Sequence, residues 1–326
     1  MLPILSRLRR AALVFGVIQP AGAVQGGSAR HPEDLVLKVL VAGASGLVGR
    51  HLIRHLAAAR VDVFGASRSK KGDLPLDLAR PEILVDRLPP GVTHAVVCCG
   101  LTAIDECARD PVGSSNVNVA QTLALIRALV AHGVAPVFCS SDLVFSGDRG
   151  RYHEQDVCTP TTEYGRQKLA VERALAAEAP LSLVCRFSKL YCLDSNDRSP
   201  VGQILNALDE GRSVYAADDQ IICPTRVGDT AAALLALMRA GATGVWHVAS
   251  QDRMTRFDLA MMLAAAVGRP DLVERRSIND FRFVEPRPKD VSLDASRAVE
   301  RFGLHMTSLV DNLPEIIRRR TGTSST

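Results

Sequence analysis

Short apolar runs alternate with amphipathic segments along the chain from residue 37 onward. Each run is five or six residues long and rich in Val, Leu and Ala. The segments between the runs carry apolar residues three or four positions apart, which is helical spacing. Continuous apolar strands separated by helices are typical of a parallel sheet that helices cover on both faces. The pattern therefore predicts a doubly wound α/β (Rossmann) fold, with strands over residues 37–42, 61–66, 94–99, 136–140 and 181–186.

Helical periodicity is clearest in three segments, and a looser region follows them. Val48–Leu56, Val119–Leu129 and Tyr164–Ala177 each predict a helix packed on the sheet. Beyond Phe187, helical segments lie around residues 201–210, 227–240, 255–267, 294–303 and 308–319, which predicts a smaller mixed α/β substrate lobe. The expected boundaries are 37–186 plus about 221–248 for the sheet domain, and about 187–220 plus 249–317 for the lobe.

The first 36 residues differ from the rest. Residues 1–32 contain four arginines and no acid, and an apolar stretch over residues 11–18 follows the basic cluster. That stretch is too short to span a bilayer, which takes about 20 residues. The segment resembles a weak signal peptide, but we favour a disordered extension or an over-long gene start. The tail over residues 318–326 is basic, then polar, and is expected to fray.

Composition and charge exclude several classes of protein. The 326 residues are 47% hydrophobic and 23% charged, with a formal net charge of +4. Such a chain has enough apolar residues for a sizeable core and is not intrinsically disordered. No dense stripe of Lys and Arg stands beside aromatic residues, so nucleic acid is not an expected partner. A membrane is not expected either, and a homodimer is compatible with the sequence.

The eight cysteines favour a reducing compartment. None forms a CxxC pair, and Cys98, Cys99, Cys139 and Cys185 lie inside apolar runs predicted as strands. Buried, reduced thiols that act as small apolar groups explain this placement better than disulfides or a zinc site. We therefore expect a cytoplasmic protein.

A glycine-rich turn joins the first predicted strand to the first predicted helix. The turn is Gly43-Ala-Ser45-Gly46-Leu47-Val48-Gly49, and in this place it is the fingerprint of a dinucleotide site. Gly43 lets the chain turn sharply, and Gly46 lets backbone amides approach a pyrophosphate at the positive end of the helix. Gly49 lets helix and strand pack closely. A glycine turn without a ligand is the weaker interpretation, because the motif follows the first strand.

The end of the second predicted strand favours NADP. Sites that prefer NAD place an Asp or Glu there to hold the ribose hydroxyls. Here the chain continues as Gly65-Ala-Ser67-Arg68-Ser-Lys-Lys, whose hydroxyls and cations suit a 2′-phosphate. A solvated basic loop is the alternative, and use of NAD stays open. The other residues expected to contribute to the cofactor site are Asp77, Leu78, Cys98, Cys99 and Gly100.

A phenol, an amine and a hydroxyl complete the predicted site. Tyr164 and Lys168 stand four residues apart and so share one face of a helix. A phenol has an ordinary pKa near 10, and we expect the neighbouring ammonium to lower it. Ser140 and Ser141 end a strand at the carboxyl edge of the sheet, where crevices bind ligands. A serine there can hydrogen-bond a substrate carbonyl while Tyr164 protonates its oxygen, and Lys168 can also hold the nicotinamide ribose.

Other candidate clusters are weaker. His51 and His55 share one helix face, but no third metal ligand is evident, so a solvated or capping role is favoured over a metal. Glu154 and Asp156 lie in a predicted polar loop. Arg287 could bind a phosphate with two hydrogen bonds or form a salt bridge between the lobes, and the sequence does not separate these roles.

Several ordered motifs carry a family resemblance. The first set is Gly43–Gly49, Ser141, Tyr164 and Lys168, and the second is Thr102–Cys107, Val117-Asn118, Cys139–Gly147, Thr159-Pro160, Asp219-Gln220 with Pro224-Thr225, and Arg287–Asp294. The first set resembles an extended short-chain dehydrogenase/reductase. The second set is similar to the dTDP-4-dehydrorhamnose reductase family, and the resemblance covers roughly residues 37–317.

This resemblance implies an NADP-dependent reductase of a 4-keto sugar nucleotide, as in dTDP-rhamnose biosynthesis. It implies that Ser141 is the catalytic hydroxyl, with Tyr164 and Lys168 beside it. The residues it places toward the substrate are Thr102, Asp105, Lys189 and Arg287. The chain departs from the family pattern at Lys189, where a tryptophan would pack beside the sugar nucleotide, and at Leu101 and Leu143.

Two other functions stay open. The non-catalytic subunit of methionine adenosyltransferase resembles the same family, so dinucleotide binding alone does not establish turnover. A sugar-nucleotide epimerase could use the same scaffold. A dehydratase is disfavoured, because no Asp-Glu pair stands beside Ser141. The set of Ser141, Tyr164 and Lys168 favours the reductase.

Overall fold

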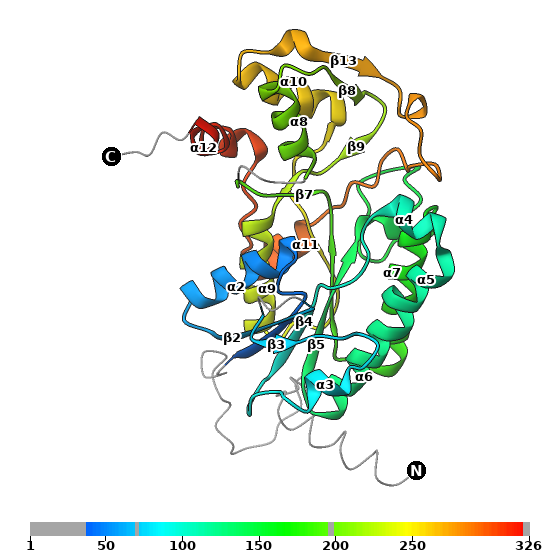
Figure 1. Cartoon of the computed structure of the whole chain (residues 1–326), viewed down its shortest axis with the longest axis vertical. Helices are drawn as coiled ribbons and strands as arrows, with labels where there is room; N and C mark the ends of the chain where they lie inside the picture. Colours follow the sequence, from blue (N-terminus) through cyan, green and yellow to red (C-terminus); the bar gives the residue numbers. More distant parts are fainter. Residues whose placement is uncertain (1–36, 69–71, 195–198, 322–326) are drawn as a thin grey trace.

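A seven-stranded parallel sheet forms the centre of the molecule (Figure 1). The computed structural model describes residues 37–68, 72–194 and 199–321, so the extension expected over residues 1–36 lies outside the described residues. In chain order the sheet strands are β1 (Lys38–Ala42), β2 (Asp62–Ser67), β3 (Leu74–Pro75), β4 (His94–Val97), β5 (Ala135–Ser141), β6 (Leu183–Phe187) and β11 (Gly244–Val248). All neighbouring pairs are parallel, which confirms the predicted doubly wound α/β fold.

The strand order creates one crevice at the carboxyl edge of the sheet. The order is β11-β6-β5-β4-β1-β2-β3, so the chain runs outward from β1 in both directions and reverses between β1 and β4. Ala42 pairs with Val97, and Ser141 pairs with Phe187. The ends of β1, β4, β5 and β6 therefore meet at this edge, which we call the carboxyl edge. Ligands of open α/β sheets bind in such a crevice.

Helices cover both faces of the sheet (Figure 1). On one face pack α2 (Leu47–Ala58), α9 (Val227–Arg239) and α11 (Ser296–Phe302). On the other face pack α3 (Glu82–Val85), α6 (Thr122–Ala131) and α7 (Glu163–Glu178). Val39 and Val41 of β1 contact the first set, whereas Leu40 contacts the second. Apolar side chains on both sides of each central strand explain why these strands are continuous apolar runs.

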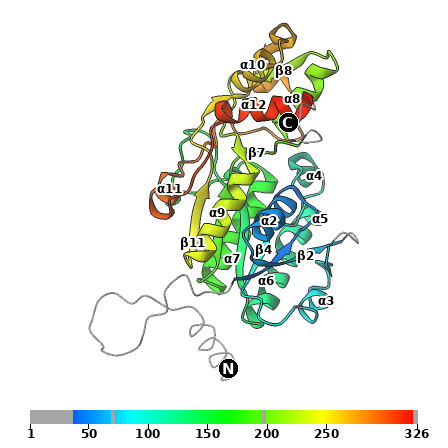
Figure 2. The same ribbon diagram turned by 90° about the vertical axis from the view of Figure 1, so that its left-hand side faces the viewer.

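A smaller lobe lies beyond the carboxyl edge (Figure 2). Its helices are α8 (Pro200–Asp209), α10 (Arg256–Ala266) and α12 (Leu309–Thr321), with the short turns η4 (Pro270–Leu272) and η5 (Ile278–Asp280). Its strand pairs are β7 (Leu190–Tyr191) with β10 (Thr225–Arg226), β9 (Ile221–Ile222) with β12 (Met254–Thr255), and β8 (Val214–Ala217) with β13 (Val273–Arg276). α12 stays helical to Thr321, past residue 318 where the frayed tail was expected.

Two parts of the sheet domain differ from the predicted pattern. β11 joins the sheet beside β6, although its sequence Gly-Val-Trp-His-Val lacks an uninterrupted apolar run. The helix predicted over 119–129 begins earlier, as the π-helix η2 (Asn116–Gln121), and follows α4 (Ile104–Arg109) and α5 (Pro111–Ser115). The wider π-turn carries the buried Asn118, whose amide contacts the loop after β4. Across the described residues, no helix is long and apolar enough to cross a membrane.

A buried ion pair locks α7 onto the sheet. Arg186 of β6 and Glu172 of α7 meet at 2.7 Å, and each side chain is only 4% exposed. The Arg186 Nε atom donates to both Glu172 oxygens, at 3.1 and 3.2 Å. The Ser140 hydroxyl at the end of β5 donates to the same carboxylate. β5, β6 and α7 are therefore joined through one desolvated group.

We expect Glu172→Gln to lower the free energy of unfolding by about 3–5 kcal/mol, because it leaves the Arg186 charge buried without its counter-charge. The matched control is Glu178→Gln on the same helix. Glu178 is exposed and pairs with Arg127 at 2.7 Å, and its loss should cost less than about 1 kcal/mol. Urea unfolding of both variants measures the difference. Equal losses would show that burial of the Glu172 pair does not matter.

Candidate active site

The glycine turn between β1 and α2 has no room for side chains. Gly43 has a φ of +105°, and a Cβ there would lie 2.8 Å from the amide nitrogen of Cys99. A Cβ on Gly49 would lie 2.2 Å from the carbonyl oxygen of Gly43. Both atoms would clash with backbone, so only glycine fits at these positions. As a result α2 starts directly against the ends of β1 and β4.

The amino end of α2 fits the pyrophosphate of a dinucleotide. The helix begins at Leu47 with Gly46 as its N-cap, and within this fully described helix no side-chain cap and no acid in the first turn compete for its amides. Ser45 and Gly46 are exposed, and Leu47 and Val48 are half-buried. Open amides at the positive end of a helix bind phosphate. The residues predicted from the glycine motif therefore present a suitable backbone surface.

The end of β2 carries a cation, and the structure adds an acid that the sequence analysis missed. Ser67 is buried and Arg68 is exposed. Asp73 returns toward the strand from the following loop, and its Oδ2 accepts a hydrogen bond from Gly65 N at 2.7 Å. Six positions separate Asp73 from the end of β2, which is why the strand-end pattern did not show it. Its carboxylate is held by the backbone amide.

Asp77 and Leu78 lie in the loop that follows β3. Asp77 forms an ion pair with Arg80 at 2.9 Å and accepts a hydrogen bond from Ala79 N at 3.0 Å. Leu78 packs against the apolar cluster that α3 and α6 share with the sheet. The structure therefore gives both residues local contacts, and their predicted role at the cofactor stays a prediction.

Helix α7 brings Tyr164 and Lys168 to the carboxyl edge. A Cβ on Gly165 would lie 2.0 Å from the carbonyl oxygen of Leu143, so the helix lies directly against the turn η3 (Asp142–Val144). Tyr164 is 8% exposed. Lys168 Nζ lies 5.6 Å from the centre of the Tyr164 ring and donates to the carbonyl oxygen of Cys139 at 2.8 Å. Phenol and amine are thus neighbours beside the end of β5.

Ser141 completes the group from the end of β5. Its Oγ donates to Asp142 Oδ1 at 2.9 Å and accepts from Leu143 N at 3.2 Å. The other oxygen of Asp142 accepts from Ser188 Oγ at 3.0 Å. Burial raises the pKa of Asp142. One buried carboxylate therefore connects the hydroxyls that follow β5 and β6.

The pKa of Tyr164 is opposite to the sequence-based expectation. Burial raises the pKa of this phenol above its ordinary value of 10.0, and the charge of Asp142 adds to the effect. Lys168 donates to Cys139, and burial lowers the pKa of the lysine itself. The expectation of a lowered phenol pKa is wrong for this structure, because loss of water around a phenolate outweighs the nearby ammonium. Tyr164 is therefore a protonated donor through the neutral range.

A buried hydrogen-bond network joins α7 to the loop after β4. Gln167 Oε1 accepts from Asn118 Nδ2 at 2.7 Å, and Gln167 Nε2 donates to Ser114 Oγ at 2.7 Å. Asn118 also holds both the amide and the carbonyl of Leu101, at 2.7 and 2.9 Å. Gly100 has a φ of +137°, and a Cβ there would lie 2.8 Å from Asn118 Oδ1. The network fixes Gly100, a predicted cofactor residue, relative to α7.

Three thiols lie near this loop and the amine of Lys168. All eight cysteines are free. Cys98, Cys99 and Cys139 are close enough to Lys168 to act on its pKa. Burial raises the pKa of Cys99 to about 12. These environments agree with the interpretation of the cysteines as reduced thiols that act as small apolar groups.

Among the residues predicted to face the substrate, Arg287 and Asp105 form an ion pair with each other, whereas Lys189 has no such partner. Arg287 pairs with Asp105 of α4 at 2.7 Å, and Asp105 also accepts from Val284 N at 3.0 Å. Of the two roles open to Arg287, the structure shows the salt bridge between the sheet domain and the lobe. Thr102 is exposed just before α4. Lys189 is half-buried between β6 and β7, and burial together with Arg256 lowers its pKa to about 8.

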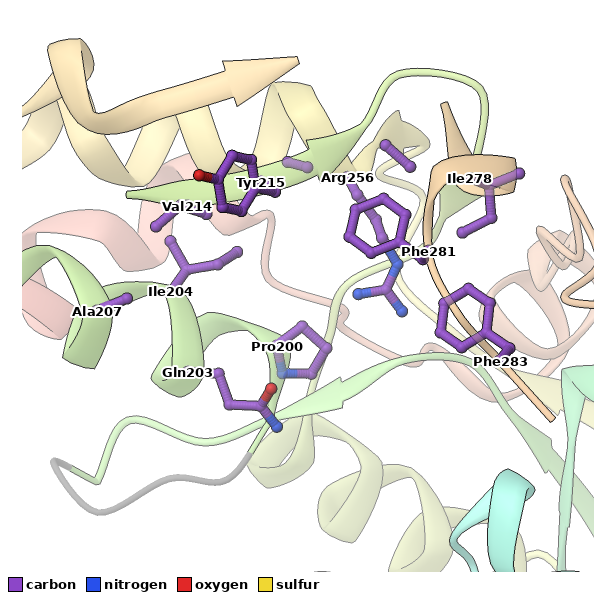
Figure 3. Close-up of a pocket in the computed structure, with 12 residues that line it drawn as sticks. Pro200, Gln203, Ile204, Ala207, Val214, Tyr215, Arg256, Ile278, Phe281 and Phe283 are labelled. Carbon is purple, nitrogen blue, oxygen red and sulfur yellow. The ribbon is translucent and has the colours of Figure 1, made fainter. Parts of the chain in front are cut away.

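A cavity of about 310 Å³ lies in the lobe next to these residues (Figure 3). Arg256, Phe281, Phe283 and Tyr215 line it, and its floor comes from α8. The rings of Phe281 and Phe283 are stacked with centres 6.0 Å apart. Figure 3 shows the Arg256 guanidinium between Pro200 and Phe283. Flat rings beside a guanidinium suit a base and a phosphate group. The sequence analysis did not identify this cavity.

His51, one of the two histidines considered as metal ligands, lies near two further possible ligands, but the surroundings do not suit a metal ion. His51, Cys192 and Asp194 present ligand atoms within 4.8 Å of one another. However, the Asp194 carboxylate lies within 4.0 Å of guanidinium groups on Arg50, Arg54 and Arg319. Three positive groups around one carboxylate oppose a metal ion there.

Glu154, predicted in a polar loop, is instead buried, and its Oε1 accepts from His247 N at 3.2 Å.

Comparison with known proteins identifies relatives along nearly the whole described chain. Residues 37–321 match the family described as RmlD substrate binding domain. The chain is 30% identical over 284 residues to the probable low-salt glycan biosynthesis reductase Agl14 of Haloferax volcanii, which covers 84% of this chain and 95% of the relative. A crystal structure of a hypothetical dTDP-4-dehydrorhamnose reductase from Sulfolobus tokodaii matches with a TM-score of 0.76 and 28% identity, over 86% of this chain and 99% of that one.

Some relatives are not named for a reductase activity. Methionine adenosyltransferase 2 subunit beta of Rattus norvegicus is 26% identical over 278 residues, which is 82% of this chain and 83% of the relative. The fold and the dinucleotide turn are therefore compatible with more than one role.

Proposed function

Because the chain belongs to the family of the RmlD substrate binding domain, we propose that it is an NADPH-dependent reductase of a 4-keto sugar nucleotide. The observation that carries the proposal is a buried, protonated phenol, Tyr164, held beside Ser141 and Lys168 at the carboxyl edge. The glycine turn lies at the same edge. The relatives named for reductase activity support the same reaction class.

The three residues divide the proton chemistry between them. NADPH, when bound, supplies the hydride for the carbonyl carbon. Tyr164 gives its phenolic proton to the carbonyl oxygen as negative charge develops there. Ser141 Oγ already accepts from Leu143 N, so rotation of its O–H away from Asp142 is enough to hydrogen-bond the same oxygen. Lys168 holds the ribose of the cofactor and stabilises the phenolate that remains.

We propose that the cavity of the lobe binds the nucleotide part of the substrate. We assign the base to the ring-lined part near Phe281 and Phe283, and the diphosphate to the Arg256 end. Arg256 donates to Gln220, and among the described residues no carboxylate lies within 4.0 Å of its guanidinium. A guanidinium without a carboxylate partner is a suitable phosphate ligand. The sugar then reaches from the cavity to Tyr164.

The main alternative is a regulatory subunit that binds a dinucleotide without turnover, as the relation to methionine adenosyltransferase 2 subunit beta suggests. An epimerase on the same scaffold is the second alternative. Oxidation of NADPH by a keto sugar nucleotide separates the reductase from both. A regulatory subunit binds NADPH and shows no oxidation, and an epimerase returns its cofactor unchanged after each turnover.

We expect Tyr164→Phe to lower kcat for NADPH oxidation by about 10²–10⁴-fold, because it removes a positioned general acid and keeps the ring. Affinity for NADPH should stay nearly unchanged. Lys168→Met should lose both rate and NADPH affinity. Tyr191→Phe is the control, because Tyr191 is a buried phenol of the lobe that accepts from Asn312 Nδ2 at 2.8 Å, and kcat should survive its loss. Full activity in Tyr164→Phe would mean that the proton has another source.

A second expectation concerns the choice of cofactor. NADPH should bind more tightly than NADH, and Arg68→Ala should weaken NADPH alone by roughly tenfold to a hundredfold, the equivalent of a charged hydrogen bond of about 1.5–3 kcal/mol. Arg80→Ala is the matched control, because Arg80 is exposed and pairs with Asp77. Fluorescence titration with both cofactors measures the constants. Equal binding of NADH and NADPH by the unmodified protein would contradict the assignment.

The pKa of Tyr164 sets the shape of the pH profile. Reduction needs the protonated phenol, and burial raises its pKa above 10.0, so the donor is lost only on the alkaline side of that value. We expect kcat at saturating substrate to be level from pH 6.5 to about pH 9. Far-UV circular dichroism and NADPH titration over the same range control for unfolding. A fall in kcat centred below pH 8 would show that the phenol pKa is lowered after all.

A further inference from the structure

Lys189 is a half-buried cation without an anionic partner. Its side chain lies between β6 and β7 at the carboxyl edge. Among residues 37–68, 72–194 and 199–321, no carboxylate oxygen lies within 4.0 Å of its Nζ, and no acceptor lies within 3.5 Å. By contrast, the exposed Lys289 pairs with Asp219 at 3.1 Å. An unpaired amine that is withdrawn from water is unfavourable unless a ligand supplies the negative charge.

The charges that face Lys189 do not neutralise it. Burial lowers the pKa of Lys189 most, and the charges of Arg256 and Arg287 lower it further. Only the carboxylate of Asp142 in η3 acts in the opposite direction. The two oxygens of Asp142 already accept from Ser141 and Ser188. Arg287 has its own partner in Asp105. Three cations of this crevice have no carboxylate partner among the described residues. Lys168 donates to the carbonyl oxygen of Cys139, and Arg256 donates to Gln220, whereas Lys189 has no hydrogen-bond acceptor within 3.5 Å.

Lys189 and Arg256 lie at different ends of the expected substrate. Lys189 is two residues beyond Phe187, which pairs with Ser141 across β5 and β6. The Asp142 carboxylate links the hydroxyls of Ser141 and Ser188, directly before Lys189. Lys189 is thus near the place where the carbonyl must lie. Arg256 instead lines the lobe cavity.

The geometry of a pyranose ring indicates which substituent of the sugar lies near Lys189. In a hexose, C1 with its diphosphate is opposite C4, whereas C5 with its C6 substituent is next to C4. A cation near the reacting C4 oxygen is therefore close to the C6 substituent and away from the diphosphate. We propose, on the basis of the function proposed above, that Lys189 binds a carboxylate at C6, so that the sugar of the preferred substrate is a hexuronate rather than a neutral or 6-deoxy hexose.

The test compares nucleotide sugars that differ only at C6. Binding to the NADP⁺ complex is measured by calorimetry for UDP-glucuronate against UDP-glucose, and for GDP-mannuronate against GDP-mannose. These stable alcohols stand for the product of the reduction. In at least one pair we expect the hexuronate to bind about tenfold more tightly or better. Lys189→Met should remove this preference and leave the neutral sugar nucleotide unchanged, whereas Lys189→Arg should keep it.

Lys289→Met is the matched control, because it removes a nearby but exposed and ion-paired amine and should leave the preference intact. Melting temperature and NADP⁺ affinity of each variant report on folding. Equal affinity within both pairs, with binding retained, overturns the hexuronate assignment and leaves the reductase proposal standing. Equal weakening of both members by Lys189→Met also overturns it, because Lys189 would then contact the diphosphate. If NADP⁺ binds but no sugar nucleotide does, the proposed function itself fails, and this inference with it.

Discussion

The buried ion pair between Glu172 and Arg186 is the interaction on which the carboxyl edge depends. Tyr164, Lys168 and Glu172 are spaced four residues apart on α7, so one helix face carries the proposed proton donor, the neighbouring amine and the anchoring carboxylate. Glu172 meets Arg186 of β6 and the hydroxyl of Ser140, the residue before Ser141. Such a pair is tolerated in a core only when its hydrogen bonds are complete. The same contacts that satisfy the pair therefore fix α7, with Tyr164 and Lys168, relative to the end of β5, with Ser141.

Beyond this anchor, the charges along the crevice are unevenly distributed. Burial raises the pKa of the Tyr164 phenol and keeps it protonated, and the Lys168 ammonium beside it donates to the carbonyl oxygen of Cys139. Toward the lobe lie Lys189 and then Arg256, which lines the cavity of the lobe. The ion pair between Asp105 and Arg287 joins the sheet domain to the lobe. A ligand with an uncharged reacting carbonyl and anionic groups farther along matches this arrangement, which is the charge pattern of a keto sugar nucleotide.

How far the sequence predicts this structure depends on whether a feature is local. The central strands, the main helices and the glycine turn follow from periodicity and spacing, and a phenol and an amine four residues apart must share a helix face. Asp73, Glu172 and Arg186 matter through partners in other elements, which no spacing rule shows. Phe281 and Phe283 line a cavity only after the lobe has folded. The lowered pKa expected for Tyr164 failed for the same reason, because the sequence shows the neighbouring ammonium but not the degree of burial.

The raised phenol pKa also bears on the direction of the proposed chemistry. Reduction of a carbonyl generates an alkoxide, which is a far stronger base than a phenolate, so a phenol need not be unusually acidic to protonate it. Oxidation of the alcohol would need the phenolate at the start, and burial beside Asp142 disfavours that form. Lys168 is the only cation whose contacts place it beside the phenol in the described chain, and its ammonium donates to a carbonyl of β5. Tyr164 is a neutral phenol whose charged form is disfavoured by burial, and this property fits the reductive direction of the proposed reaction better than the oxidative one.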